Sequence, residues 1–161
     1  FWVVLIDVGK GSLPIWLLPG LALPWIVPDP EISRTWLTYA IGGAAIVGHC
    51  YPVWFRFAGG KGAATAIGAL IVIDPLLLLP AGITWILVLS ISGYVALATI
   101  SAAVVIPLYI AFTSLQNGLD LLVFTALLAA FIVFTHRSNI QRILSGHEDR
   151  DMRSSWLGRS R

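Results

Sequence analysis

The sequence predicts an all-α, polytopic membrane helical bundle of about six transmembrane helices, including short paired spans. Hydrophobic residues make up 58% of the 161 residues and charged residues only 11%, whereas a soluble domain carries about 25% charged residues. The mean hydropathy of +0.88 agrees with a chain that lies largely in lipid. Apolar runs separated by polar turns also recur along the whole sequence. From the length we expect one domain, residues 1–161.

The apolar runs define the expected helices in order. The first lies within residues 1–27, whose end is rich in proline and carries a turn signal. The second occupies residues 35–55. Residues 63–73 are apolar but cover only about half of a 30 Å hydrocarbon core. Asp74 and Pro75 then break the run, and three more spans follow over residues 76–91, 95–112 and 119–134.

Positive charge decides whether residues 63–91 form one long span or two short ones. Two short spans make the total even, so both chain ends lie on one side of the membrane. That side then collects most of the basic residues: Lys10, Arg56, Lys61, Arg137, Arg142 and the arginines of the tail. Because Lys and Arg favour the cytosolic side, we expect the even count, with the basic face in the cytosol.

One polar stretch, residues 48–65, reads GHCYPVWFRFAGGKGAAT and combines basic side chains with four glycines. Glycine lets the backbone approach a ligand closely, and the N–H groups at a helix start attract anions. Gly59, Gly60 and Gly62 around Lys61 therefore predict a phosphate-binding loop, to which Arg56 adds charge. The alternative is a cytosolic loop that only satisfies the positive-inside rule. A nucleotide P-loop is excluded, because that motif needs Ser or Thr after its lysine.

Two further polar groups are expected on the same face. Ser92 lies at a helix junction, where its hydroxyl can cap a helix or bind a ligand oxygen. If helical, residues 135–142 place His136, Asn139 and Arg142 along one stripe. Taken singly, these three can be an ordinary polar residue, a cap and an anchor. Together with the glycine stretch they predict a phosphate-sized anion site at the cytosolic membrane surface.

The other ionisable residues limit the chemistry. Asp7 is expected to pair with Lys10, and Glu148, Asp149 and Asp151 are expected in a charged tail. No carboxylates on the basic face are suitably spaced for a two-metal site, so we expect no metal and no cofactor. The same lack argues against a CDP-alcohol phosphotransferase. A phosphate transporter built around the break at Asp74 is the other alternative, although its site would lie near the membrane midplane. Cys50 allows no internal disulfide and is expected to be a small buried residue.

These residues resemble a known family, the bacterial membrane glycerol-3-phosphate acyltransferases that use acyl-phosphate as donor. The second motif of that family matches Gly48, His49, Pro52, Phe55, Gly59 to Gly62, Ala64 and Thr65. Its third motif matches His136, Arg137, Asn139, Ile140, Arg142 and Gly146. Asp7, Lys10, Gly11 and Pro14 resemble its second helix, and Ser92, Gly93 and Tyr94 its short cytosolic turn. Tyr51 and Ala63 depart from the usual Phe and Val.

The resemblance implies a reaction in phospholipid biosynthesis: acyl transfer from acyl-phosphate to the 1-hydroxyl of glycerol 3-phosphate, giving lysophosphatidic acid and phosphate. The substrates and membrane lipid are then the partners, with no nucleic acid. The implied catalytic residues are Lys61, His136, Asn139 and Ser92, with His136 as a general base a further hypothesis. The implied substrate-binding residues are His49, Gly59, Gly60, Lys61, Gly62 and Arg142.

The resemblance also implies a location and a helix count. The family consists of multi-pass proteins of the bacterial cytoplasmic membrane, with seven helices and motifs that face the cytosol. We therefore expect this chain to lack the first helix and the first motif, a loop of the type GSGNxGATN. The sequence predicts no oligomeric state.

Overall fold

The structure, a computed structural model, describes residues 2–18, 34–113 and 118–150. In these residues the chain is helical and no strand occurs, so the expected all-α class is confirmed there. The chain divides into two compact units, Phe1–Pro75 and Leu76–Arg161, and each is described by itself. The expectation of one domain stays a prediction. The proline-rich turn expected at the end of residues 1–27 lies outside the described residues.

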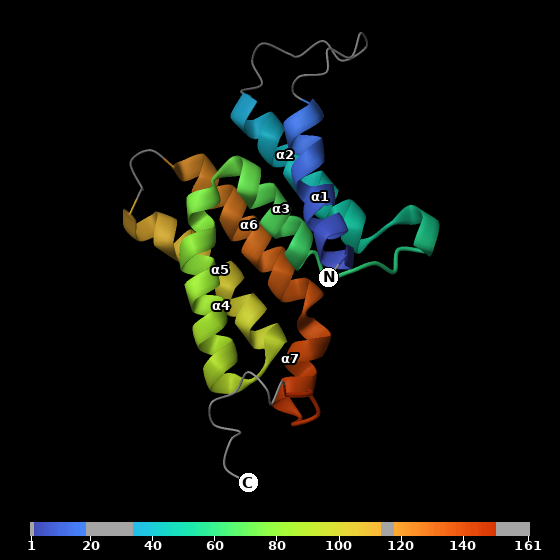
Figure 1. The fold of residues 1–161 in the computed structure, drawn as a ribbon, viewed down its shortest axis with the longest axis vertical. Coiled ribbons are helices and arrows are strands. Elements are labelled where there is room, and N and C mark those ends of the chain that lie inside the picture. The colour runs from blue at the N-terminus through green and yellow to red at the C-terminus, as the bar shows by residue number, and fades with distance from the viewer. Residues whose placement is uncertain (1, 19–33, 114–117, 151–161) are drawn as a thin grey trace. The chain divides into compact units, whose positions relative to one another are not determined.

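The described residues of unit 1 form three α-helices and a short 3-10 turn between the last two (Figure 1). These are α1 (Trp2–Leu17), α2 (Arg34–Cys50), the 3-10 turn η2 (Val53–Phe55) and α3 (Ala63–Ile73). α1 packs against both α2 and α3, and α2 also contacts α3. The second span was expected to run to residue 55, but α2 ends sooner. Pro52 explains the difference, because proline has no N–H to donate and its ring blocks the preceding turn of a helix.

Small residues let α1 and α3 approach each other at backbone distance. A Cβ atom on Gly11 would overlap the carbonyl oxygen of Thr65, and one on Gly68 would overlap the carbonyl oxygen of Val8. Ala69 beside them is fully buried. Close approach through small residues is common between membrane helices, where lipid provides no hydrophobic force for association. The crossing places the middle of α1, which carries Asp7 and Lys10, against the first half of α3.

The predicted break between the two short spans is confirmed. Asp74 takes an extended conformation after α3, and its N–H donates to the carbonyl oxygen of Leu70 at 2.9 Å. A 3-10 turn, η3 (Pro75–Leu77), then leads into α4 (Leu78–Ser92). Proline ends the earlier helix because it cannot donate the next helical hydrogen bond.

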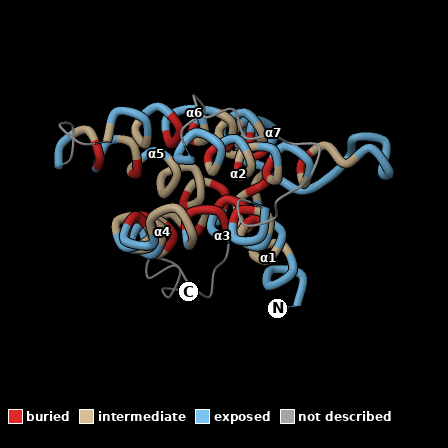
Figure 2. Tube along the Cα trace, turned by 90° about the horizontal axis from the view of Figure 1, so that it is seen from above, coloured by how far each residue is buried: buried red, intermediate tan, exposed pale blue. Residues whose placement is uncertain are grey.

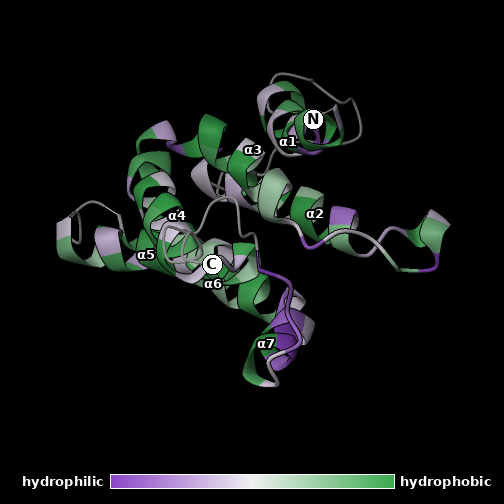
Figure 3. Cartoon of the chain, turned by 60° about the horizontal axis from the view of Figure 1, so that its bottom comes forward, coloured by the Kyte–Doolittle hydropathy of each residue, from purple (hydrophilic) through white to green (hydrophobic). Residues whose placement is uncertain are grey.

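In the part of unit 2 that the structure describes, α4 is followed by α5 (Val95–Thr113), α6 (Leu119–Thr135) and α7 (Arg137–Leu144). α5 packs against α4 and α6, and α7 contacts α5 and α6. The indole Nε1 of Trp85 donates to Oγ1 of Thr99 at 3.2 Å, which links α4 to α5. Figure 3 shows that α4, α5 and α6 are mainly hydrophobic whereas α7 is hydrophilic. α7 is therefore suited to water or lipid headgroups rather than to the hydrocarbon core.

Two helical segments in the described part of the chain are long and apolar enough to cross a membrane, Pro75–Ser92 and Val95–Thr113. α6 and α7 give a third if they are counted as one span bent by 56°. Exposed stretches run along these helices (Figure 2), and they include large apolar side chains such as Phe112. Apolar side chains that face outward suit contact with lipid. The expected number of about six spans stays a prediction.

Candidate active site

The glycine loop, residues 51–62, leaves the end of α2 and turns back to begin α3. The N–H of Gly59 donates to the carbonyl oxygen of Cys50 at 3.0 Å, and that of Gly60 donates to the carbonyl oxygen of His49 at 3.3 Å. A Cβ atom on Gly59 would overlap that same oxygen of His49. We expected these N–H groups to bind phosphate. In the structure both are used to hold the loop against α2.

The start of α3 retains the features expected of an anion site. Gly62 is the N-cap and takes a left-handed conformation, with φ of 83°. The first N–H groups of any helix have no acceptor within it and carry the positive end of the helix dipole. Lys61, which precedes Gly62, is exposed. Thr65 in the first turn is fully buried, and its Oγ1 has no hydrogen-bond partner among the described residues.

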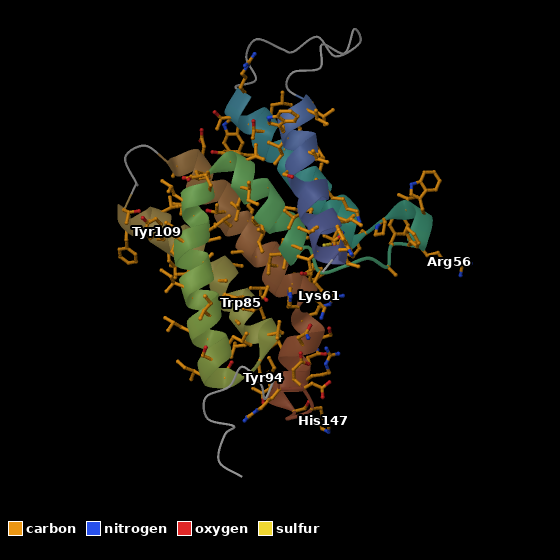
Figure 4. All side chains as sticks on the ribbon, in the orientation of Figure 1. Arg56, Lys61, Trp85, Tyr94, Tyr109 and His147 are labelled. Atoms are coloured by element: carbon orange, nitrogen blue, oxygen red, sulfur yellow. The ribbon has the colours of Figure 1, made fainter. Side chains whose placement is uncertain are left out.

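The tip of the glycine loop is exposed and strained. Arg56 and Phe57 take left-handed conformations, with φ of 53° and 61°, although neither is glycine. The carbonyl oxygen of Pro52 accepts two N–H groups, including that of Phe57 at 3.0 Å, and Trp54 is 92% exposed. Figure 4 shows Arg56 at the tip of the loop and Lys61 at its base. Arg56 therefore does not join Lys61 at the start of α3, contrary to expectation.

His49 connects the glycine loop to α1. Its Nδ1 lies 3.5 Å from Oδ1 of Asp7, and a Cβ atom on Gly60 would overlap its Nε2. The expected pair of Asp7 with Lys10 is confirmed, with 3.0 Å between Oδ1 and Nζ. Sequence reasoning missed the contact of Asp7 with His49, because the two residues lie on different helices and share no sequence spacing.

Ser92 is the last residue of α4, directly before the C-cap Gly93. Its hydroxyl donates to the carbonyl oxygen of Val88 at 2.7 Å and accepts the N–H of Tyr94 at 3.1 Å. Gly93 between them takes a left-handed conformation, and its N–H donates to the carbonyl oxygen of Leu89. The hydroxyl therefore bonds to the backbone before and after this turn, and a role in ligand binding stays a prediction. Its catalytic role stays a prediction.

His136 lies at the break between α6 and α7 and is 5% exposed. Its Nδ1 is 2.8 Å from the carbonyl oxygen of Ile132, one turn earlier in α6. A carbonyl oxygen can only accept, so Nδ1 carries the hydrogen and the lone pair of the neutral ring is on Nε2. A ring oriented in this way can accept a proton at Nε2.

Asn139 and Arg142 share a partner that sequence reasoning missed, Glu148. Nδ2 of Asn139, a residue that is 6% exposed, donates to Oε1 of Glu148 at 2.5 Å. Nε of Arg142 donates to Oε2 at 2.6 Å. The expected common face of Asn139 and Arg142 is therefore confirmed, but a carboxylate of the same chain binds the donors that we assigned to substrate.

The turn after α7 explains how Glu148 reaches this position. The N–H of His147 donates to the carbonyl oxygen of Arg142, and the N–H of Gly146, with φ of 73°, donates to that of Ile143. This pair of bonds is the Schellman motif, which ends a helix and reverses the chain. Gly146 after a helical stretch was the signal that could have identified Glu148 as a partner of α7 rather than part of a charged tail.

The segment after α7 contacts the turn between α4 and α5 at one end of unit 2. Nε of Arg150 donates to the hydroxyl of Tyr94 at 2.9 Å, and its guanidinium lies 4.9 Å from the centre of that ring. The segment that carries Glu148 thus reaches the turn that follows Ser92. Figure 4 shows Tyr94 and His147 at this end of the unit. The glycine loop belongs to unit 1, and the predicted meeting of all three polar groups stays a prediction.

The remaining expectations concern metals and the cysteine. No group of three His, Cys, Asp or Glu residues that could hold a metal ion occurs in residues 2–18, 34–113 and 118–150. The expectation of a site without metal or cofactor stays a prediction. Cys50 is buried at the end of α2, as expected.

The apolar helices with polar groups at their ends define an all-helical integral membrane protein. The glycerol-3-phosphate acyltransferase family matches residues 1–146. The chain belongs to this family, and the resemblance found in the sequence is confirmed.

Individual relatives of the chain are also named as glycerol-3-phosphate acyltransferases. A glycerol-3-phosphate acyltransferase of Albidiferax ferrireducens is 36% identical over 153 residues, which cover 91% of this chain and 64% of that relative. The one of Bordetella pertussis is 39% identical over 152 residues, covering 89% and 65%. The chain therefore spans just under two thirds of the length of these curated relatives.

The fold is similar to a solved structure of PlsY (YgiH), described as an integral membrane glycerol 3-phosphate acyltransferase in its lysophosphatidic acid form. The TM-score is 0.77 and the identity 30%, and the match covers 92% of this chain and 70% of that one. A second structure, of the glycerol 3-phosphate form, has the same TM-score.

Proposed function

We propose that this protein transfers a fatty acyl group from acyl-phosphate to the 1-hydroxyl of glycerol 3-phosphate. The product is lysophosphatidic acid, and the reaction belongs to phospholipid biosynthesis. The family and the two ligand forms of the PlsY structure support the acceptor and the product. The observation that carries the proposal is the placement of Lys61 directly before the N-cap of α3, where a phosphate meets an ammonium and the helix dipole together.

In unit 1 the binding group for a substrate phosphate is the ammonium of Lys61 with the first N–H groups of α3. Gly62 contributes its left-handed conformation, which starts the helix. Gly59, Gly60 and His49 contribute shape, since they hold the loop against α2. In this proposal Lys61 contacts the phosphate directly. The glycines and His49 shape the backbone that carries it.

In unit 2 the polar groups at the start of α7 orient donor or acceptor. Nε2 of His136 accepts a hydrogen bond or a proton, because Nδ1 is committed to Ile132. Asn139 and Arg142 provide an amide and a guanidinium, held in place by Glu148. Ser92 shapes the turn between α4 and α5, because its hydroxyl bonds to the backbone at Val88 and at Tyr94.

The reaction needs no protein nucleophile. The 1-hydroxyl oxygen of glycerol 3-phosphate attacks the carbonyl carbon of the acyl-phosphate and forms the new ester bond. The bond from that carbon to the phosphate oxygen breaks, and the phosphate leaves with the electron pair. The hydroxyl proton passes to the leaving phosphate, or to Nε2 of His136 in the general-base version. Positioning and stabilisation of charge then supply most of the rate.

We also propose where the protein lies in the cell. The protein is a multi-pass protein of the bacterial cytoplasmic membrane, with residues 1–161 part of one membrane acyltransferase domain and its motifs facing the cytosol. The exposed tip of the glycine loop allows a test in unit 1. With Cys50→Ala in place, a cysteine introduced as Arg56→Cys should react with a membrane-impermeant maleimide only from the cytosolic side. Labelling in intact cells would contradict this orientation.

The donor is tested with the protein expressed from its complete gene, purified and reconstituted in vesicles. Labelled glycerol 3-phosphate is supplied with acyl-phosphate, acyl-coenzyme A or an acylated carrier protein, and the lipid product is measured. We expect lysophosphatidic acid with acyl-phosphate alone. Product only with a thioester donor would contradict the proposal. Uptake of label into sealed vesicles without any lipid product would favour the transporter alternative.

A further inference from the structure

Asp7 places a charge on the apolar helix α1, where a carboxylate is unfavourable unless partners stabilise it. Its side chain is only 16% exposed, and its Oδ1 faces two nitrogen atoms. Nζ of Lys10 lies at 3.0 Å on a side chain that is 54% exposed. Nδ1 of His49 lies at 3.5 Å on a side chain that is 13% exposed. The carboxylate of Asp7 therefore has an exposed partner, Lys10, and a largely buried partner on α2, His49.

Of these two partners, His49 is the one whose orientation the contact with Asp7 can fix. Exposed ion pairs contribute little, because water and salt screen them and the long side chains lose entropy. A contact that excludes water is stronger and more directional. Nδ1 of His49 faces Oδ1 of Asp7 at 3.5 Å, and Nε2 on the other side of the ring lies against Gly60.

His49 in turn holds Gly60 in two ways. Its carbonyl oxygen accepts the N–H of Gly60 at 3.3 Å. Its ring lies directly against the α-carbon of Gly60, since a Cβ atom built there would overlap Nε2 and lie 2.9 Å from Cε1. A rotation of the ring toward the loop would therefore displace the backbone at Gly60, and a rotation away would remove the surface against which it packs.

Gly60 sets the position of the groups that follow it. Lys61 is the next residue, and Gly62 begins α3. The backbone that carries the ammonium of Lys61 and the first N–H groups of α3 is thus anchored, through the ring of His49, to a carboxylate on α1. All of these contacts lie within unit 1.

We propose that Asp7 is a positioning residue of the phosphate site. It acts through the imidazole of His49, which fixes Gly60 and with it Lys61 and the start of α3. The identification of the ligand as glycerol 3-phosphate rests on the proposed function. The contacts that connect Asp7 to Gly60 through His49 are independent of it.

The test measures binding separately from turnover. The protein, expressed from its complete gene, is purified in detergent, and its melting temperature is followed as glycerol 3-phosphate is added without acyl donor. Kinetics with acyl-phosphate are measured in parallel. We expect Asp7→Ala to raise the Kd and KM for glycerol 3-phosphate about tenfold and to change kcat less than about twofold, as for lost support of a binding group.

Two matched variants separate positioning from general damage. Lys10→Gln removes the exposed partner of Asp7 and should leave Kd within about twofold of wild type, since exposed pairs contribute little. Asp7→Glu keeps the charge and should restore most of the affinity. If Asp7→Ala fails to fold, Asp7→Asn replaces it, with a smaller loss of affinity in the same direction.

A double-mutant comparison tests the route through His49. If Asp7 acts only through that ring, Asp7→Ala adds nothing to the loss caused by His49→Gln. Losses that multiply in the double variant would overturn the proposal, and so would an Asp7→Ala protein that binds glycerol 3-phosphate as wild type does. Wild-type protein that binds glycerol 3-phosphate but makes no lysophosphatidic acid would overturn the proposed function alone. The binding series would still decide the role of Asp7.

Discussion

At the scale of single residues, Arg56 is the clearest case of a side chain in an unfavourable backbone conformation. Its φ of 53° lies in the left-handed region, which costs a residue with a Cβ atom about 1–2 kcal/mol. We expect Arg56→Gly to raise the free energy of unfolding by about 1 kcal/mol, since glycine adopts this conformation without strain. Denaturation of the purified protein in detergent measures the change.

The control for this variant is Arg56→Ala, which removes the charge and keeps the Cβ atom. We expect it to leave stability nearly unchanged. Equal stabilisation by both variants would show that charge at the loop tip, rather than backbone strain, is responsible.

Candidate site residues could be identified from the sequence where the signal is local, and contacts between distant residues could not. Lys61 and Gly62 stand out because cations and glycines in an apolar chain are visible without any knowledge of the fold. The contacts of Asp7 with His49 and of Glu148 with Asn139 join residues from different segments. No periodicity in the sequence connects such pairs, because their distance is set by the packing of helices and by a chain reversal.

At the scale of elements, the crossing of α1 and α3 depends on the absence of a side chain at Gly68. We expect Gly68→Ala to destabilise the protein by about 1–3 kcal/mol, because the added methyl group overlaps the backbone of Val8. Unfolding in detergent, followed by circular dichroism, measures this change.

Gly43 in α2 is a matched control, since a Cβ atom there has nothing within 4 Å. We expect Gly43→Ala to be neutral or to stabilise the helix by up to about 1 kcal/mol. Equal effects of the two substitutions would contradict close packing between α1 and α3.

The turn after α7 supports a second prediction at this scale. Removal of the carboxylate by Glu148→Ala leaves the buried amide of Asn139 without this acceptor. We expect a loss of about 1–3 kcal/mol in the free energy of unfolding. Glu148→Gln keeps one acceptor oxygen and should lose less. The exposed neighbour offers a control, Asp149→Asn, and a loss there as large as that of Glu148→Ala would argue against a specific role for Glu148.

Element boundaries could be predicted where proline or glycine marks them. Pro75 marks the break that follows α3. Pro52 marks the end of α2, but the apolar residues after it extended the predicted span too far, because hydrophobicity alone does not show that the backbone has left the helix. The hydrophilic character of α7 was visible in the sequence, whereas the bend at His136 was not.

At the scale of the whole molecule, composition was sufficient to predict an integral membrane helical protein. A chain with so few charges has no polar surface with which to cover a soluble domain. The number of spans and the side of the membrane that the motifs face depend on charge statistics, and they remain predictions. The family is known from the motifs and the comparisons together.

The most direct test of acyl transfer at a phosphate site is the turnover of Lys61→Ala with acyl-phosphate and glycerol 3-phosphate. Membrane insertion and melting temperature are measured on the same preparation, with Lys61→Arg as a charge-retaining control. We expect Lys61→Ala to insert normally and to lose at least about a hundredfold in kcat/KM, as for loss of a charged group that binds the reacting phosphate. Normal turnover by Lys61→Ala would contradict a phosphate site at the start of α3.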